Sequence, residues 1–150
     1  MNKLHATLMK QALAAIALGA FLLPAWAQMS PVGTWNSIDD KTREPKAEIR
    51  ITEGANGLSG RIEKTLRPGA KTVCDECTDE RKGQPMVGLE IIRGGKKDAD
   101  KDTWEGGTIL DPENGKQYRA SFTPIEGGRQ LQVRGYLGPF WRTQIWQRVP

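Results

Sequence analysis

The chain has 150 residues, of which 37% are hydrophobic and 27% are charged, and its formal net charge is +4 at pH 7. This length suits one domain rather than several. The single histidine, His5, lies in an N-terminal segment that we expect to be removed, which excludes Ser-His-Asp catalysis, Cys-His catalysis and histidine-ligated metal sites from the remaining chain.

Residues 1–27 have the order of features that marks a bacterial export signal. Two lysines give a positive start, an apolar run covers residues 12–23, and Ala25 and Ala27 supply the small side chains that signal peptidase requires. The apolar run is too short for a comfortable membrane span, and no later segment would form one. We therefore expect cleavage after Ala27 and a periplasmic or secreted protein of residues 28–150. An uncleaved anchor is the alternative.

Removal of this segment changes the charge of the protein. Lys3 and Lys10 leave with it, so the formal net charge falls to +2, and positive and negative side chains alternate along the remaining chain. Such a balance offers little attraction for nucleic acid or an anionic membrane. We therefore expect no nucleic-acid partner and, after processing, no integral membrane protein.

Short alternating runs separated by turn residues begin after residue 28. The first runs cover residues 33–38, 46–53 and 58–66. Ile49 and Ile51 share one face of the second run, which is typical of a half-buried strand. Asn56-Gly57 follows that run and tolerates the positive φ of a tight hairpin turn.

Residues 67–85 interrupt the strands and contain both cysteines. The segment is long for a hairpin loop, so we expect it to cover one end of the fold as a lid. Cys74 and Cys77 form a C-x-x-C pair, which predicts a structural disulfide in an oxidising compartment. The acidic residues around the pair oppose thiol activation, and a zinc site needs more ligands than two cysteines. Redox and metal roles are the alternatives.

Residues 86–93 form the next predicted strand, and residues 96–102 form a charged tip after it. Three aspartates alternate within this tip, as they do at the start of a calcium loop. Thr103 and Ile109 stand where that pattern needs glycine and glutamate. We therefore expect a solvated hairpin tip and no metal site.

Four further runs complete the chain. They cover residues 103–110, 116–123, 130–136 and 142–148, with turn residues at 111–115 and 127–128. Eight short strands suit a small closed barrel, which leaves no open edge for aggregation. The sequence therefore predicts an all-β domain, a single antiparallel eight-stranded up-and-down barrel.

The first strand opens with Gly33-Thr34-Trp35, which resembles the G-x-W motif of the lipocalin and calycin group. The resemblance implies a structural role: Gly33 and Trp35 close one end of the barrel, and an arginine from the last strand packs across the tryptophan. Arg142 and Arg148 are the candidates for that cation, since a guanidinium stacks favourably on an indole ring.

The wider sequence closely resembles the bacterial family called domain of unknown function 2147. The matching stretches are residues 33–35, 38–40, 73–77, 82–90, 104–107, 111–116, 133–136, 142–144 and 146. The resemblance implies a secreted or periplasmic protein with a lipocalin-like barrel, and it implies no established activity or catalytic residue. The chain differs from the family pattern at Phe140-Trp141, where many members have smaller residues.

A barrel of this size either encloses one small ligand or is filled by its own side chains. We expect a protein that binds a small apolar or amphipathic molecule, without a cofactor, rather than an enzyme. Strand alternation gives the inward candidates for ligand contact, which are Trp35, Tyr118, Phe122 and Tyr136, and it directs Arg134 outward. Core packing is the alternative role for each inward candidate.

Two other functions stay open at this point. A thiol-redox helper would use Cys74 and Cys77. A protein-interaction or envelope-structural module would use Phe140-Trp141, an aromatic pair beside Gly138-Pro139, because tryptophan is a common anchor at interfaces.

Overall fold

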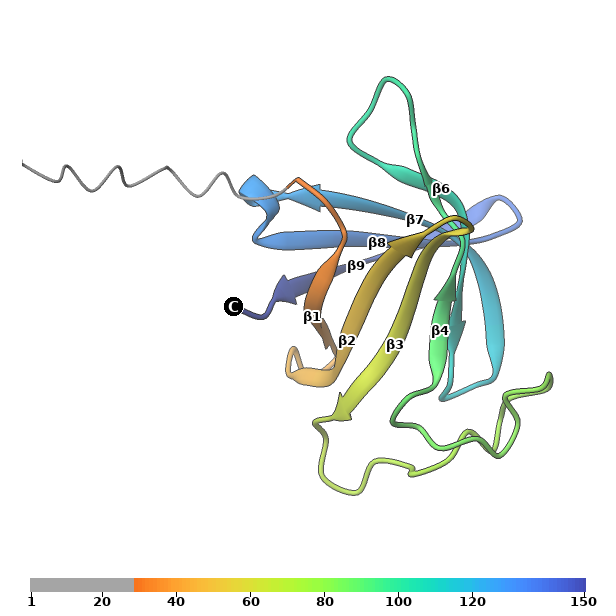
Figure 1. Ribbon diagram of the computed structural model, residues 1–150. Coiled ribbons are helices and arrows are strands. Elements are labelled where there is room, and N and C mark those ends of the chain that lie inside the picture. The colour runs from red at the N-terminus through yellow and green to blue at the C-terminus, as the bar shows by residue number, and fades with distance from the viewer. Residues whose placement is uncertain (1–28) are drawn as a thin grey trace, which may run out of the picture.

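The computed structural model describes residues 29–150, so the predicted export signal lies outside the described residues. Figure 1 shows strands that curve around one interior, with a long loop running below β3 and β4. The strands are β1 (Gly33–Ile38), β2 (Pro45–Gly54), β3 (Gly57–Thr65), β4 (Glu90–Arg93), β5 (Lys96–Lys97), β6 (Trp104–Asp111), β7 (Lys116–Ile125), β8 (Gln130–Leu137) and β9 (Phe140–Arg148). A three-residue 3-10 turn, η1 (Glu126–Gly128), joins β7 to β8.

The sheet is antiparallel throughout and closes on itself. β1 pairs with both β2 and β9, and the second of these pairings places Trp35 opposite Arg148. The circle is completed where Ile92 of β4 lies opposite Ile109 of β6. Because β5 is only a two-residue extension beside β6, eight longer strands form the barrel. The prediction of an all-β, closed antiparallel barrel is confirmed.

One strand is shorter than its alternation predicts. β4 begins at Glu90, whereas the sequence predicts a strand from residue 86. The Met86 amide donates to the Thr72 carbonyl at 2.7 Å, and the Gly88 amide donates to the Ile62 carbonyl at 2.7 Å. These bonds commit residues 86–88 to the preceding loop and to β3, so regular pairing starts only after them.

The charged tip between β5 and β6 is a turn capped by its own aspartate. The Asp98 carboxylate accepts hydrogen bonds from the amides of Asp100, at 2.8 Å, and Lys101, at 3.1 Å. The Asp100 amide is the main cause that lowers the pKa of Asp98. Asp98 therefore serves the local backbone here, and no cluster of metal-ligating side chains occurs within residues 29–150.

One half of the barrel interior is tightly packed. Its side chains have 2% exposure or less and include Trp35, Ile51, Leu58, Ile92, Phe122 and Leu131. Burial of large aromatic and branched side chains is the main source of stability in a domain of this size. The structure thus places Trp35 and Phe122 in packed core and not on a cavity wall, because neighbouring strands fill the space around them.

The barrel end beyond this core, formed by residues 29–32 and the turns at 54–57 and 126–129, is called the closed end below. Arg148 lies across Trp35, with its guanidinium carbon 4.1 Å from the ring centroid. It also donates to the carbonyls of Gly128, Val32 and Ser30 at 2.6–2.9 Å. A side chain at Gly33 would collide with the Arg148 guanidinium, which explains the glycine.

Candidate functional site

The other half of the barrel interior holds a cavity of about 730 Å³. Apolar side chains form its inner wall: Ala47, Ile49, Ile62, Met86, Ile91, Ile109, Leu110, Val133 and Trp146. Trp146 is only 2% exposed, and its Nε1 donates to the Gln144 side-chain oxygen at 3.1 Å. These residues separate the cavity from the packed core. The volume lies within the range of about 300–1,000 Å³ that is usual for small-molecule sites.

Three segments surround the opening of this cavity and are called the mouth below. They are residues 67–71 after β3, residues 111–113 in the β6–β7 turn, and residues 137–142 around the β8–β9 hairpin. Pro68, Lys71, Phe140 and Trp141 are exposed, so the mouth opens to solvent. The cavity therefore has an apolar interior and a mixed rim.

Ion pairs tie the segments of the mouth together. Glu113 accepts hydrogen bonds from Lys46, at 2.7 Å, and from Arg67, and Arg67 also donates to Asp39 at 2.8 Å. Partial burial would raise the pKa of Glu113, but the two cationic donors outweigh it and lower that pKa. Glu113 therefore remains ionised and cross-links the β6–β7 turn to β2 and to the loop after β3.

A second ionic contact at the mouth joins β9 to the β1–β2 turn. Arg142 of β9 pairs with Asp40 of the β1–β2 turn, and Gln144 donates to the same Asp40 oxygen at 3.2 Å. Arg142 thus lies at the mouth and not on Trp35. Of the two arginines proposed to close the barrel, Arg148 is the one that does so, because β9 brings only its last residues beside Trp35.

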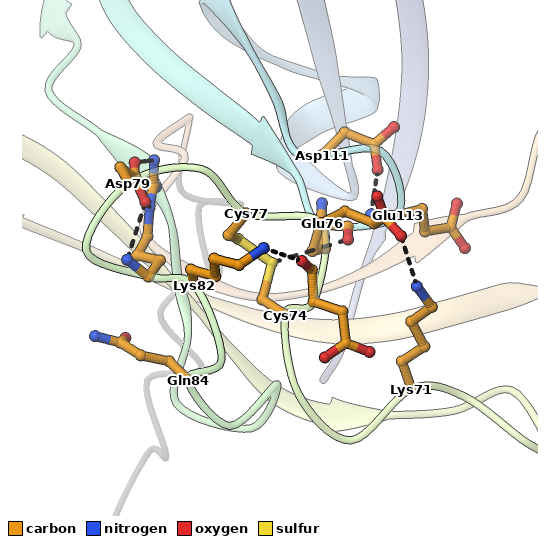
Figure 2. Close-up of a disulfide and its surroundings, with 12 residues drawn as sticks. Lys71, Cys74, Glu76, Cys77, Asp79, Lys82, Gln84, Asp111 and Glu113 are labelled. Carbon is orange, nitrogen blue, oxygen red and sulfur yellow. Dashed lines mark hydrogen bonds and ion pairs between the residues drawn. A yellow bond between two sulfur atoms is a disulfide. The ribbon is translucent and has the colours of Figure 1, made fainter.

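The long loop between β3 and β4 is held by a disulfide, as predicted (Figure 2). Cys74 and Cys77 are bonded, and both are 0% exposed. Figure 2 shows the pair beside Asp111 and Glu113 of the β6–β7 turn. A buried disulfide is poorly accessible to thiols, so this geometry favours a structural role over redox exchange.

Two further contacts anchor the same loop. Arg81 is 2% exposed and donates through Nε to the Asp79 carboxylate at 3.1 Å and through Nη1 to the Glu90 carbonyl at 2.9 Å. Gly115 of the β6–β7 turn lies so close to the Glu76 carbonyl that a Cβ there would collide with it. The loop is therefore fixed against the barrel, and its first residues form one side of the mouth.

The sequence of residues 33–148 matches the family model described as "Uncharacterized protein conserved in bacteria (DUF2147)". The match spans every strand of the barrel. The chain belongs to the DUF2147 family. The family resemblance found in the sequence is confirmed, and it carries no assigned activity.

A solved structure supports the fold of this DUF2147 protein. It is described as "Protein HP1028 from the human pathogen Helicobacter pylori belongs to the lipocalin family", with a TM-score of 0.69 and 12% identity, over 82% of this chain and 85% of that chain. At this identity the similarity concerns the fold alone. No curated protein matches the DUF2147 chain in sequence.

The structure separates the four residues predicted to contact a ligand. Tyr118 of β7 lines the cavity beside Gly135 of β8. Tyr136 instead lies on the outer face, where its hydroxyl is 3.2 Å from that of Ser121. Trp35 and Phe122 belong to the packed core. The inward facing expected for Tyr136 was wrong, because Tyr136 is in phase with Arg134 and out of phase with the buried Val133. Within the DUF2147 barrel, alternation also gives no height along the barrel axis.

Sequence reasoning missed several residues that form the cavity wall. Ala47, Ile109 and Gly135 line it, and two of them, Ala47 and Gly135, have a small side chain or none. Ala47 is in phase with Ile49 and Ile51, so extending that alternation by one step would have identified it. Gly135 carries no such signal, because the space it leaves is visible only once Tyr118 is placed beside it.

No helix within residues 29–150 combines the length and apolar character needed to cross a membrane. Uncharged polar side chains also line the cavity, among them Ser37, Tyr118 and Gln144. Ser37 donates to the Ala47 carbonyl at 3.3 Å, and Gln144 is engaged by Asp40 and Trp146. The arrangement can therefore bury an apolar chain and offer a few polar contacts near the rim.

Proposed function

We propose that this DUF2147 protein binds one small amphipathic molecule, with its apolar part in the barrel cavity and its polar part at the mouth. The observation that carries the proposal is a 730 Å³ cavity beside a core whose side chains are almost fully buried. A barrel that served only as a scaffold would gain stability by filling this space, since cavities cost free energy. A cavity that stays unfilled next to a tightly packed core therefore supports a ligand-binding function.

The chemistry of the wall supports an amphipathic ligand over a polar one. The inner wall is mostly apolar, with Trp146 and Tyr118 as its aromatic residues, whereas the cations and carboxylates lie at the mouth. A charged group placed deep in the cavity would lose its hydration without a partner, which is costly. The polar end of the ligand therefore lies near Arg67, Lys71 and Arg142.

We further propose that the protein acts in the periplasm or outside the cell. The export pattern of residues 1–27 and the buried disulfide support this location, since disulfides persist in oxidising compartments. Small-molecule binding is also in keeping with the solved structure described as a lipocalin-family protein.

The test is a titration with fluorescent alkyl carboxylates of increasing chain length. We expect saturable binding of one probe per chain, with affinity rising by up to about fourfold for each added methylene until the cavity is full, because each buried CH₂ contributes about 0.8 kcal/mol. Affinity that does not depend on chain length, or no saturable binding, would contradict the proposal.

A filled-cavity variant provides the control. Gly135 has no positive φ, and a Cβ there would lie 3.5 Å from the Tyr118 Cβ, in ordinary contact. Gly135→Phe should therefore fold and place its ring in the cavity, lowering probe affinity by at least about tenfold. Thr52→Phe adds the same ring on an exposed face of β2 and should bind like the parent protein.

A further inference from the structure

The exposed hydrophobic side chains of this protein are concentrated around the cavity mouth. Residues 29–150 expose six large ones, which are Met29, Leu66, Val87, Leu137, Phe140 and Trp141. Leu66 and Val87 adjoin Arg67 and Met86, which line the cavity, and the last three belong to the β8–β9 hairpin. Only Met29 lies at the closed end. The two ends of the barrel therefore present different chemistry to their surroundings.

The β8–β9 hairpin is the most apolar of these segments. Residues 137–141 are called the hairpin tip here, and within it Leu137 is 59%, Trp141 64% and Phe140 74% exposed. Leu137 pairs with Phe140 across the turn. Exposing this much aromatic and aliphatic surface to water is unfavourable, and such patches mark sites of contact with another apolar phase or molecule.

The C-terminal part of the chain, which carries the hairpin tip, is rich in basic residues, although two of them, Arg129 and Arg148, lie at the closed end. Residues 116–150 contain six Lys or Arg and a single acidic residue, Glu126, whereas residues 29–115 contain 14 Lys or Arg and 17 Asp or Glu. The nearly balanced net charge of the chain conceals this division. The expectation of little attraction to an anionic membrane rests on that net charge and overlooks the basic C-terminal segment.

Basic and aromatic side chains are neighbours across β7, β8 and β9 near the hairpin tip. Tyr136 lies directly opposite Arg119 on one side and Trp141 on the other. Arg134 and Arg142 adjoin this row along β8 and β9. Aromatic residues with a polar edge, flanked by arginine and lysine, are typical of segments that lie at a lipid–water interface.

We propose that the hairpin tip is an interfacial anchor that places the cavity mouth against the surface of an anionic lipid bilayer. A bilayer fits better than a folded protein partner, because the exposed apolar residues lie on two separate loops around an opening, the β3–β4 loop and the β8–β9 hairpin, instead of forming one continuous flat patch. Leu137, Phe140 and Trp141 would insert among the lipid headgroups while Arg119, Arg134 and Arg142 contact lipid phosphates.

The role proposed for this membrane anchor rests on the proposed ligand-binding function. Phe140 and Trp141 both border the cavity, so a ligand with an apolar chain would pass between bilayer and barrel without crossing water. The ligand class follows from this geometry: a single-chain amphipathic lipid or a lipid-soluble molecule, taken from or delivered to a membrane leaflet.

The experiment measures binding of the processed protein to vesicles. Trp141 is exposed, whereas Trp35, Trp104 and Trp146 are at most 3% exposed, so a change in tryptophan emission reports on the hairpin tip. We expect a blue shift and co-sedimentation with vesicles of phosphatidylglycerol and phosphatidylcholine, and at least about tenfold weaker binding to phosphatidylcholine alone. No co-sedimentation with either vesicle would overturn the proposal.

Matched variants locate the contact. Phe140→Ser with Trp141→Ser should weaken co-sedimentation by at least about tenfold, whereas Met29→Ser, at the closed end, should have no effect. Arg119→Gln should weaken binding to the anionic vesicles, and Arg129→Gln, a 75% exposed arginine beyond η1, should not. If the two variants of either pair weaken vesicle binding equally, the assignment of the membrane contact to the hairpin tip is contradicted.

The two proposals fail in different ways. Gly135→Phe fills the cavity and should still bind vesicles. Parent protein that binds alkyl probes but not vesicles overturns the anchor and leaves the ligand site standing. If the parent protein binds vesicles but not the alkyl probes, the proposed passage of a lipid through the mouth is overturned. A dimer that forms with increasing concentration and is lost in Trp141→Ser, without vesicle binding, would assign the hairpin tip to a second copy of the chain.

Discussion

At the scale of single residues, Arg148 combines more roles than any other side chain at the closed end. It stacks on Trp35 and donates to three backbone carbonyls, two of which belong to the segment before β1. Charged donors to backbone carbonyls are stronger than neutral ones, and a carbonyl left unpaired in a buried position is costly. The closed end therefore depends on this one guanidinium.

Arg148→Ala is expected to lower the free energy of unfolding by about 2–4 kcal/mol, because it removes a cation–π contact and leaves carbonyls without donors. Urea denaturation followed by tryptophan fluorescence measures the change. Arg129→Ala, an exposed arginine nearby, should cost less than about 0.5 kcal/mol. Similar costs for the two variants would show that the closed end does not rely on Arg148.

Asp79 gives a pH-dependent prediction. The Arg81 side chain is the main cause that lowers the pKa of Asp79 from 3.8 to about 2. A carboxylate whose pKa falls on folding stabilises the folded protein above its ordinary pKa, and this contribution disappears as the pH falls through the folded value. Asp79→Asn should therefore be less stable than the parent near neutral pH, by an amount that shrinks between about pH 4 and pH 2.

Denaturation at several pH values checks this expectation. Asp75→Asn is the control, since Asp75 is an exposed carboxylate on the same loop whose backbone carbonyl, not its side chain, is bound by Lys82. Its stability should follow that of the parent protein. A cost of Asp79→Asn that is the same at every pH would mean that Asp79 acts through packing instead of charge.

At the scale of elements, the contact between the disulfide loop and the β6–β7 turn determines one side of the mouth. Gly115 has φ of 72° and faces the Glu76 carbonyl, whereas Gly106 of β6 has φ of 75° and no atom near its missing Cβ. Both glycines accept a backbone conformation that other residues adopt only with strain. They differ in that Gly115 alone has a neighbouring atom, the Glu76 carbonyl oxygen, where a Cβ would be placed.

Replacing each glycine by alanine separates these effects. Gly106→Ala should cost about 1–2 kcal/mol, the strain of a positive φ alone. Gly115→Ala should cost more, and it should also change affinity for alkyl probes because the loop must move away from the mouth. Thermal denaturation and probe titration give the two readouts. Equal costs with unchanged affinity would show that the loop does not shape the mouth.

The elements were largely predictable from the sequence, since alternation and turn chemistry are local. The Asn56-Gly57 hairpin appears where expected, with φ of 93° at Gly57. The shortening of β4 was not predictable, because it results from amides of Met86 and Gly88 that bind groups far away in the chain. The choice between Arg142 and Arg148 likewise depends on the register between β1 and β9.

At the scale of the whole molecule, the two halves of the barrel interior differ in a way that composition does not reveal. Trp35 and Phe122 fill one half, while Ala47, Ile109 and Gly135 leave the other half partly empty. The sequence predicts which side chains point inward, but the depth at which they meet depends on strand tilt and stagger. The candidate site was therefore only partly predictable, with Tyr118 as the residue common to expectation and structure.

Polarity along the barrel axis follows the same division. The packed half ends in turns rich in charged and glycine residues, and the hollow half ends in a mouth where ion pairs lie beside the apolar hairpin tip at residues 137–141. A molecule with this asymmetry is suited to facing an apolar phase with its opening while keeping its other end in water.

The most direct test of the ligand cavity is native mass spectrometry of the processed protein, purified from its own cells without detergent. We expect a fraction of the molecules to carry a single small adduct, which denaturation releases and which Gly135→Phe lacks. Parent protein that is free of any adduct, and that takes up none when incubated with single-chain amphipaths, would contradict a ligand-binding barrel.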